Sequence, residues 1–276
     1  MALQKYGLSP ATLVVKEVTM HAAGSRFDLV ALALLALVVG GCATGGTPTA
    51  YRVHYSLHEE PVRAAPTTIV LLPPNIEVSE VSAGGVVEEV PAWTEKAIAN
   101  LKRGINAYAA TKGNLEIFAF PEIAENEVAI VNEHLALYDV VAGTAFQMTT
   151  TGGSAWKHKV DHFDYTLGSG LAFLKERTNA DAGLLVLGRH QIATGGRVAA
   201  SVLAALFAGA YVATSRNFLT LGLVDFKTGD ILWFNYTTGA SGKDMQQVED
   251  AGAIVKRLLD EFPGVEAYKK RRSSEG

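Results

Sequence analysis

The sequence has little cysteine and little charge: one cysteine, Cys42, and 19% charged residues in a chain of 276. One cysteine cannot form a disulfide within the chain, which excludes the class of small exported proteins held together by disulfides. There is no basic excess either, with 24 Lys and Arg against 28 Asp and Glu. A nucleic-acid partner is therefore not expected, because phosphate contacts need positive charge. The 49% of hydrophobic residues predict one globular domain with a core of its own.

An uncharged apolar run near the amino terminus, Leu29 to Val39, is too short to cross a bilayer core of about 30 Å as a helix. It is typical of the hydrophobic part of a secretory signal. We predict a signal peptide over residues 1–41, with Met20 as an alternative start. The run ends in Val39-Gly40-Gly41-Cys42, which resembles the lipobox of bacterial lipoprotein precursors. The resemblance implies lipid attachment, including palmitate, at Cys42. The alternative is a buried helix end with an incidental cysteine.

The segment after Cys42 is small and polar, and residues 42–50 are expected to form the lipidated end and a flexible tether. Removing residues 1–41 takes away three basic and two acidic residues and leaves 21 basic and 26 acidic ones, a net charge of −5. Ala43 follows the cysteine, and this resembles the default outer-membrane route of enteric lipoproteins. The expected location is the periplasmic face of the outer membrane.

The fold class expected for residues 51–264 is α/β, a mixed sheet with helices packed on it. Alternation and β-branched runs predict strands at 51–57, 67–72, 115–120, 184–187, 218–224 and 231–236. Helical spacing predicts helices at 91–113, 122–143, 167–178 and from 241 or 244 to 262, with a loop at 149–154. Strands 67–72 and 115–120 are expected to be buried, and 77–90 to form an exposed hairpin or a mobile loop. A second hairpin turns at 225–230, where a glycine with positive φ is expected.

Two of these segments, Ala180 to Gly188 and Leu221 to Trp233, resemble strand patterns of the CsgG, TolB amino-terminal and LpoB group of periplasmic domains. With the strand that ends at Pro73-Pro74, the resemblance covers most of residues 65–262. It implies an anticodon-binding-like topology. It also implies a lipid-anchored, non-enzymatic subunit that acts through protein partners in secretion, motility or wall synthesis.

An apolar insert, residues 198–215, lies uncharged between Arg197 and Arg216. A buried helix or helical hairpin is favoured, because apolar stretches of this length more often lie in cores. The alternatives are a contact with another copy or partner, and insertion into a membrane with the arginines as interfacial anchors. A membrane-inserting component or an oligomeric channel is therefore the second hypothesis for function. The residues proposed for such a contact are Val202, Leu203, Leu206, Phe207 and Tyr211.

The tail, residues 265–276, contains four consecutive cations, Lys269, Lys270, Arg271 and Arg272. A solvated end is the favoured interpretation. The alternative is contact with anionic head groups or wall polymers.

Candidate chemistry is sparse, and no catalytic residue, metal site or cofactor is predicted. His158 and His162 would share a helix face with Asp161 nearby, which is metal-ligand spacing, but no Glu follows His158 to act as general base. An exposed polar helix or loop is the favoured interpretation of this segment. His54 and His58 repeat the spacing, although a strand would separate them by about 13 Å. Gly152 to Trp156 lacks the last glycine of a nucleophile elbow, and Gly239 to Asp244 lacks the spacing of a phosphate loop. A metal-binding hydrolase is the third hypothesis.

Overall fold

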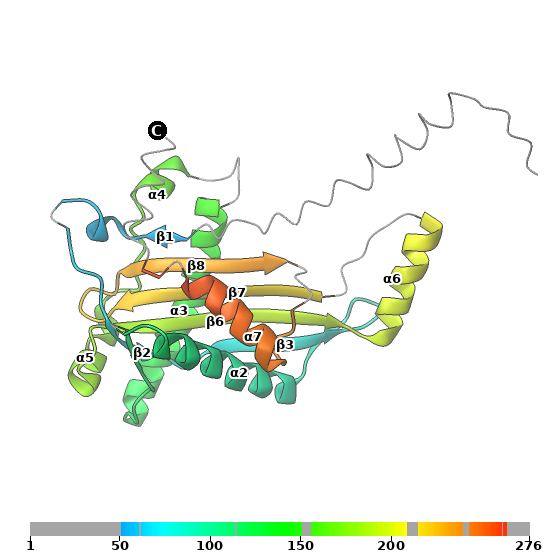
Figure 1. Cartoon of the computed structure of the whole chain (residues 1–276), viewed down its shortest axis with the longest axis horizontal. Coiled ribbons are helices and arrows are strands. Elements are labelled where there is room, and N and C mark those ends of the chain that lie inside the picture. Colours follow the sequence, from blue (N-terminus) through cyan, green and yellow to red (C-terminus); the bar gives the residue numbers. More distant parts are fainter. Residues whose placement is uncertain are drawn as a thin grey trace, which may run out of the picture. The chain divides into compact units, whose positions relative to one another are not determined.

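A computed structural model describes residues 51–60, 62–113, 115–150, 156–208, 215–239, 243–260 and 262–263. Eight strands of these residues form one mixed sheet in the order β1-β8-β7-β6-β2-β5, with β3 beside β6 and β4 beside β3. Three of the strand pairs are parallel, β2 with β5 and both β2 and β3 with β6. The sheet and its packed helices confirm the α/β class (Figure 1). The strands are β1 (Arg52–Val53), β2 (Thr68–Leu71), β3 (Asn75–Val81), β4 (Val87–Glu89), β5 (Glu116–Phe118), β6 (Ala182–Ala193), β7 (Ser215–Asp225) and β8 (Ile231–Gly239).

Pro73-Pro74 separates two strands that lie one after the other along β6. Leu71 of β2 is opposite Leu184, and Asn75 of β3 is opposite Leu187. Proline has no N–H to donate to a ladder, so β2 ends there as predicted. The chain then returns to the same neighbouring strand, and β6 is paired in parallel along both halves of its length. β6 is consequently much longer than the predicted strand.

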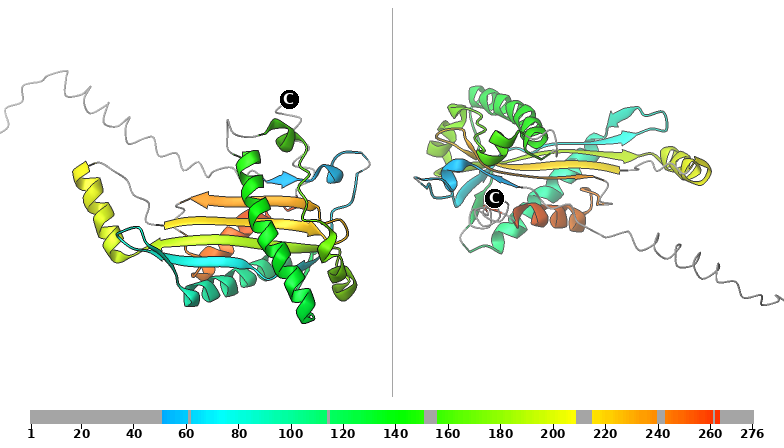
Figure 2. Two further views of the ribbon diagram at one scale, coloured as in Figure 1. Left: turned by 180° about the vertical axis from the view of Figure 1, so that it is seen from behind. Right: turned by 90° about the horizontal axis from the view of Figure 1, so that it is seen from above.

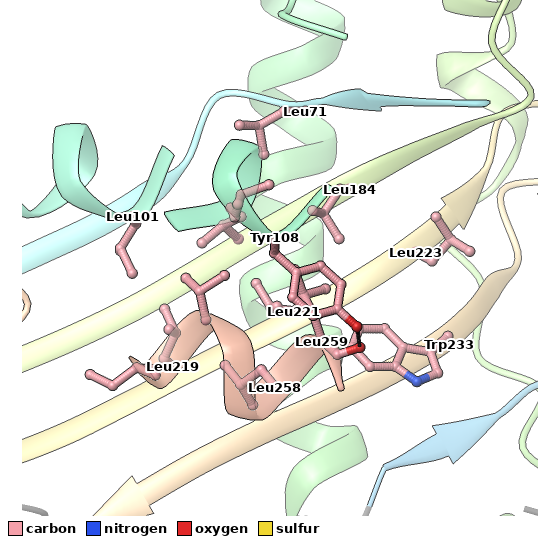
Figure 3. Close-up of a cluster of buried hydrophobic side chains, with 14 of the residues drawn as sticks. Leu71, Leu101, Tyr108, Leu184, Leu219, Leu221, Leu223, Trp233, Leu258 and Leu259 are labelled. Atoms are coloured by element: carbon pink, nitrogen blue, oxygen red, sulfur yellow. Dashed lines mark hydrogen bonds between the residues drawn. The ribbon is translucent and has the colours of Figure 1, made fainter. Parts of the chain in front are cut away.

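Helices cover both faces of the sheet. α2 (Pro91–Ala110) and α7 (Val248–Leu259) lie on one face, and α3 (Glu125–Thr150) lies on the other (Figures 1 and 2). Alternate residues of β6 enter the two cores, as the period of a strand requires: Leu184 packs towards α2 and α7, and Leu185 towards α3. Figure 3 shows the first core, where Trp233 lies with side chains of α2 and α7.

Four smaller elements complete the fold. They are the 3-10 turns η1 (Tyr55–Leu57) and η3 (Ser169–Leu171) and the short helices α4 (Lys157–Asp161) and α5 (Phe173–Thr178). Of these, η3 and α5 add Leu171 and Leu174 to the second core. The predicted helix at 167–178 is thus a 3-10 turn followed by α5, which ends at Asn179 with φ 60°. α7 starts later than predicted, at Val248.

Both hairpins are present, but the first is exposed only in part, because β3 pairs with β6 in the sheet and its Val78 and Val81 are buried. β3 and β4 pair antiparallel around Gly85, which has φ 84°. In the β7–β8 turn Gly229 has φ 77°, and a Cβ there would lie 1.9 Å from the carbonyl oxygen of Gly168. Only glycine fits this turn.

Three predicted boundaries are wrong for identifiable reasons. The strand at 51–57 stops at Val53, because the His54 imidazole accepts a hydrogen bond from the Ser56 N–H (3.3 Å) and starts a 3-10 turn. The run at 115–120 forms only β5, an edge strand whose Phe118 is 44% exposed. α3 continues past its predicted end at 143 as far as Thr150, into the first two residues of the predicted loop, and hydroxyl groups such as that of Thr144 bond back to carbonyls four residues earlier; residues 151–154 of that loop lie outside the described residues.

Candidate interaction surface

Helix α6 (Gly195–Ala208) connects β6 to β7 at one end of the sheet and projects beyond the layers of the fold (Figures 1 and 2). Thr194 starts it: its hydroxyl accepts from the Arg197 N–H (3.2 Å), and its carbonyl from the Val198 N–H (2.9 Å). The Thr194 N–H in turn donates to the Val81 carbonyl at the end of β3 (2.9 Å). The helix is therefore attached to the sheet at its first turn.

The large side chains of α6 are exposed, so the favoured prediction of a buried helix is wrong. Val202 is 53% exposed, Leu203 54%, Leu206 73% and Phe207 85%. The physical reason is topological: β6 and β7 run past the helices that cover the sheet, and α6 has no layer to pack against. The insert is also not one element, since residues 198–208 are helical and Ser215 already belongs to β7.

Two valines of the β3–β4 hairpin extend this surface. Val86 is 66% exposed and Val87 47%. The hairpin touches the base of α6, because the Arg197 guanidinium donates to the Ser82 carbonyl (3.3 Å). We call the joint surface the apolar apex, and it comprises Val86, Val87, Val198, Val202, Leu203, Leu206 and Phe207. The valines were missed from the sequence, although their exposed hairpin was predicted.

Two arginines flank the base of the apex. Arg197 is half-buried and Arg216 is exposed, and among the described residues no carboxylate lies within ion-pair distance of either. Their neighbour Arg189 differs, because its guanidinium lies 2.7 Å from the Asp139 carboxylate and 3.6 Å from that of Glu77. The apex therefore carries cationic groups that no carboxylate in the described part of the chain neutralises.

A buried histidine links the strands below the apex. His190 of β6 is 1% exposed, with Nε2 3.2 Å from the Ser215 hydroxyl and Nδ1 3.7 Å from the Asp244 carboxylate. Burial lowers the pKa of His190, while Asp244 opposes the shift. The longer distance exceeds a hydrogen bond, so the group lacks the geometry of a hydrolytic triad. It joins β6, β7 and the segment before α7.

The structure brings together one histidine from each of the two pairs singled out in the sequence, His54 and His162, because the Tyr55 ring contacts both of their rings. His158 and His162 lie on and just after α4 with ring centroids 5.8 Å apart, and Tyr55 stacks on His162 at 4.0 Å. His162 Nδ1 is 3.4 Å from the Glu59 carboxylate. Burial is the main cause that lowers the pKa of His54 beside them. Despite this convergence, the described residues contain no group of three or more His, Cys, Asp or Glu placed to hold a metal ion.

Of the remaining candidate residues, one is described by the structure. Lys243, from the glycine-rich loop that lacks the spacing of a phosphate loop, forms an ion pair with Asp250 of α7 (3.1 Å). The others lie outside the described residues: Cys42, Tyr211, Lys269, Lys270, Arg271 and Arg272.

Comparisons with known proteins give little. No family model matches the chain, and a search of curated proteins finds no relative. Two solved structures of the PelC dodecamer from Paraburkholderia phytofirmans are similar at 12% identity. One covers 76% of this chain and 91% of the PelC chain with a TM-score of 0.31, and a substituted variant covers 71% and 88% with a TM-score of 0.29. A structural similarity as weak as this does not support a shared function or a shared assembly.

Proposed function

We propose that the protein is a lipid-anchored, non-enzymatic subunit of a bacterial cell-envelope complex, held at the periplasmic face of the outer membrane. Its role is assembly, scaffolding or regulation in secretion, motility or wall synthesis. The observation that carries the proposal is the apolar apex. Exposed apolar patches of this kind mark interaction sites with proteins or membranes, and the apex offers large exposed side chains, such as Leu206 and Phe207 at 73% and 85% exposure.

The anchor is supported by the sequence around Cys42. A short apolar run, two small residues, the only cysteine of the chain and a polar tether follow one another in that order. The mixed sheet with helices on both faces fits the resemblance to the CsgG, TolB amino-terminal and LpoB group. We include the finer anticodon-binding-like topology in the proposal.

A second candidate function is a membrane-inserting component or an oligomeric channel that uses the same segment. It is favoured by the exposure of α6 around most of its circumference. In the described part of the chain, no helix is both long enough and apolar enough to cross a membrane. We do not propose a metal-binding hydrolase, because the His162 ring already stacks on Tyr55 and lies beside the Glu59 carboxylate.

The anchor is tested with the full chain expressed in a bacterium that processes lipoproteins. The native chain should incorporate palmitate and remain in the outer-membrane fraction at high salt. Cys42→Ala should lose both properties. A Cys42→Ala chain that stays in the membrane at high salt would show that lipid attachment is not the main tether.

The role is tested by the size of the native lipoprotein in mild detergent. A monomer or dimer supports the scaffold, whereas a ring of many copies supports the channel. If the apex contacts partner subunits, Leu206→Asp with Phe207→Asp should abolish crosslinks to them, and Glu176→Ala, an exposed site on α5, should leave them unchanged. Unchanged crosslinking in the apex variant would show that partner subunits bind elsewhere on the domain.

A further inference from the structure

The apolar surface of α6 is too wide for a single helix or sheet to cover. At about 100° per residue, the exposed positions from Ala205 through Val198 to Ala200 span an arc of roughly 220°. A helix that packs on one partner needs an apolar stripe only a little wider than 100°. Apart from Arg197 and the two glycines at its first turn, the exposed or half-exposed residues of α6 from 195 to 207 are Ala, Val, Leu and Phe. Helices that are apolar on nearly all sides lie in a large core or in lipid.

The polar groups of α6 fit a lipid environment. Lipid offers no hydrogen bonds, so polar groups must be satisfied within the segment. Ser201 is the hydroxyl residue of the helix, and it donates to the Arg197 carbonyl at 2.7 Å. With 14 residues, α6 is about 21 Å long, shorter than a bilayer core of about 30 Å. It is therefore suited to lie in the boundary between head groups and acyl chains.

Charge at the base of α6 points to anionic lipid. Arg197 and Arg216 lie where the apolar surface ends, as interfacial anchors do. Of the described carboxylates, none pairs with either guanidinium. Arginine binds phosphate through a planar fork of donors, and each cation near an anionic membrane contributes to binding.

The lipid anchor and the apex can reach the same membrane. Cys42 and Tyr51 are nine positions apart in the chain, a backbone reach of at most about 30 Å. Arg52 lies opposite Phe234, five positions before the end of β8 at Gly239, which is about 17 Å along the strand. Gly239 is paired with Asn217, beside the base of the apex.

We propose that α6 and the β3–β4 tip insert into the head-group boundary of a membrane rich in anionic phospholipid, with Arg197 and Arg216 on the lipid phosphates. This inference rests on the proposed function, because the anchor brings the domain to the membrane. The partner of the apex is thus a lipid surface, and a second copy of the chain or another protein is an outcome of the test.

The test uses the lipidated full chain carrying Phe207→Cys. Since Cys42 is acylated in the proposal, the new cysteine is the one free thiol for an environment-sensitive fluorophore. The protein is reconstituted in vesicles of phosphatidylethanolamine and phosphatidylglycerol that contain a lipid-borne quencher. We expect a blue-shifted emission and quenching by the lipid at position 207. The matched control is Glu176→Cys on α5, at the opposite end of the sheet (Figure 1), where neither change is expected.

The arginines are tested in the same chain by Arg197→Gln with Arg216→Gln. Quenching at position 207 should fall several-fold in vesicles with phosphatidylglycerol, and replacing this lipid by phosphatidylcholine should remove most of the difference from the parent. Equal quenching of both chains in the anionic vesicles would overturn the assignment of the arginines to phosphate.

Other outcomes separate the inference from the function beneath it. A label at 207 that is shielded only as the protein concentration rises, without quenching by lipid, would assign the apex to a second copy. A label that stays in water would overturn the inference outright. Mass measurement of the amino-terminal peptide reports acylation independently. Acylated Cys42 with an unquenched label refutes the inference alone, whereas quenching without acylation refutes the anchor alone.

Discussion

Two apolar segments of this chain differ in burial. Residues 182–187 of β6 are fully buried between helices on both faces, while residues 198–207 of α6 are almost entirely exposed, and the two are separated by only ten positions. Hydropathy does not distinguish them. The difference lies in the layers: the first segment passes through the part of the sheet that α2, α7 and α3 cover, and the second begins where that cover has ended. Apolar content therefore predicts burial only where a facing layer exists.

The strongest test of this comparison pairs one leucine from each segment. Leu185→Ala should lower the free energy of unfolding by about 2–5 kcal/mol, because it leaves a cavity in the core under α3. Leu206→Ala should change it by less than about 0.5 kcal/mol. Urea denaturation followed by circular dichroism gives both values. Equal losses would mean that α6 is covered in the isolated chain.

Glycines sharpen the same contrast. A Cβ at Gly222 of β7 would lie 2.6 Å from the Tyr138 hydroxyl, which itself hydrogen-bonds Thr220 at 3.2 Å. Gly222→Ala should therefore destabilise the fold by about 1–3 kcal/mol. A Cβ at Gly195 of α6 meets nothing within 4 Å, so Gly195→Ala should be neutral or slightly stabilising. Thermal melts of both variants measure this, and a tolerated Gly222→Ala would contradict close packing of α3 on β7.

Charge placed in the apex should spare the fold and remove binding. Leu206→Asp with Phe207→Asp should keep the native circular dichroism and melting temperature, because both side chains are exposed. Quenching of a label on the exposed Val202→Cys by lipid should fall about tenfold or more, since two large side chains no longer enter the bilayer. Leu185→Asp is the contrasting variant and should not fold. An apex variant that also fails to fold would break the separation between the two segments.

The smallest expected effect is a dependence of the fold's stability on pH, through the buried histidine below the apex. Burial lowers the pKa of His190 in the fold from its ordinary value of 6.5. The neutral form is thus favoured by folding, and its contribution to stability is complete above about pH 6.5 and is lost as the pH falls below it. The melting temperature should drop between pH 7 and 5, and less steeply in His190→Gln. His54→Gln is the companion variant, because His54 has a pKa lowered by the same cause. An unchanged slope in both variants would contradict this account.

Local patterns predicted much of the fold. The turn with Gly229, the helix start at Pro91 and the end of a strand at Pro73 all depend on backbone chemistry that one residue type imposes, and each appears in the structure. Predictions failed where contacts between distant segments determine the burial of a residue or the length of a strand. Phe118 lies in an apolar run like that of a central strand, but no further strand pairs beyond it in the described sheet. The extent of β6 likewise depends on two partner strands that the chain supplies earlier.

The candidate site was predicted in part. Val202, Leu203, Leu206 and Phe207 were identified from an uncharged run, but their exposure depends on where the helices of the sheet end, which no spacing within the run records. Val86 and Val87 join the surface through the contact of Arg197 with Ser82, and these segments are more than a hundred residues apart. The meeting of His54 with His162 is of the same kind, since each belongs to a short element positioned by the rest of the fold.

The position of α6 between β6 and β7 has a consequence for how such a domain can change. The two strands are consecutive and antiparallel, so a tight turn could replace the helix without altering a single rung of their ladder. Natural variation could therefore lengthen, shorten or exchange this one connection while the remainder of the protein folds as before. Related chains would then differ most in what they attach to and least in how they are built.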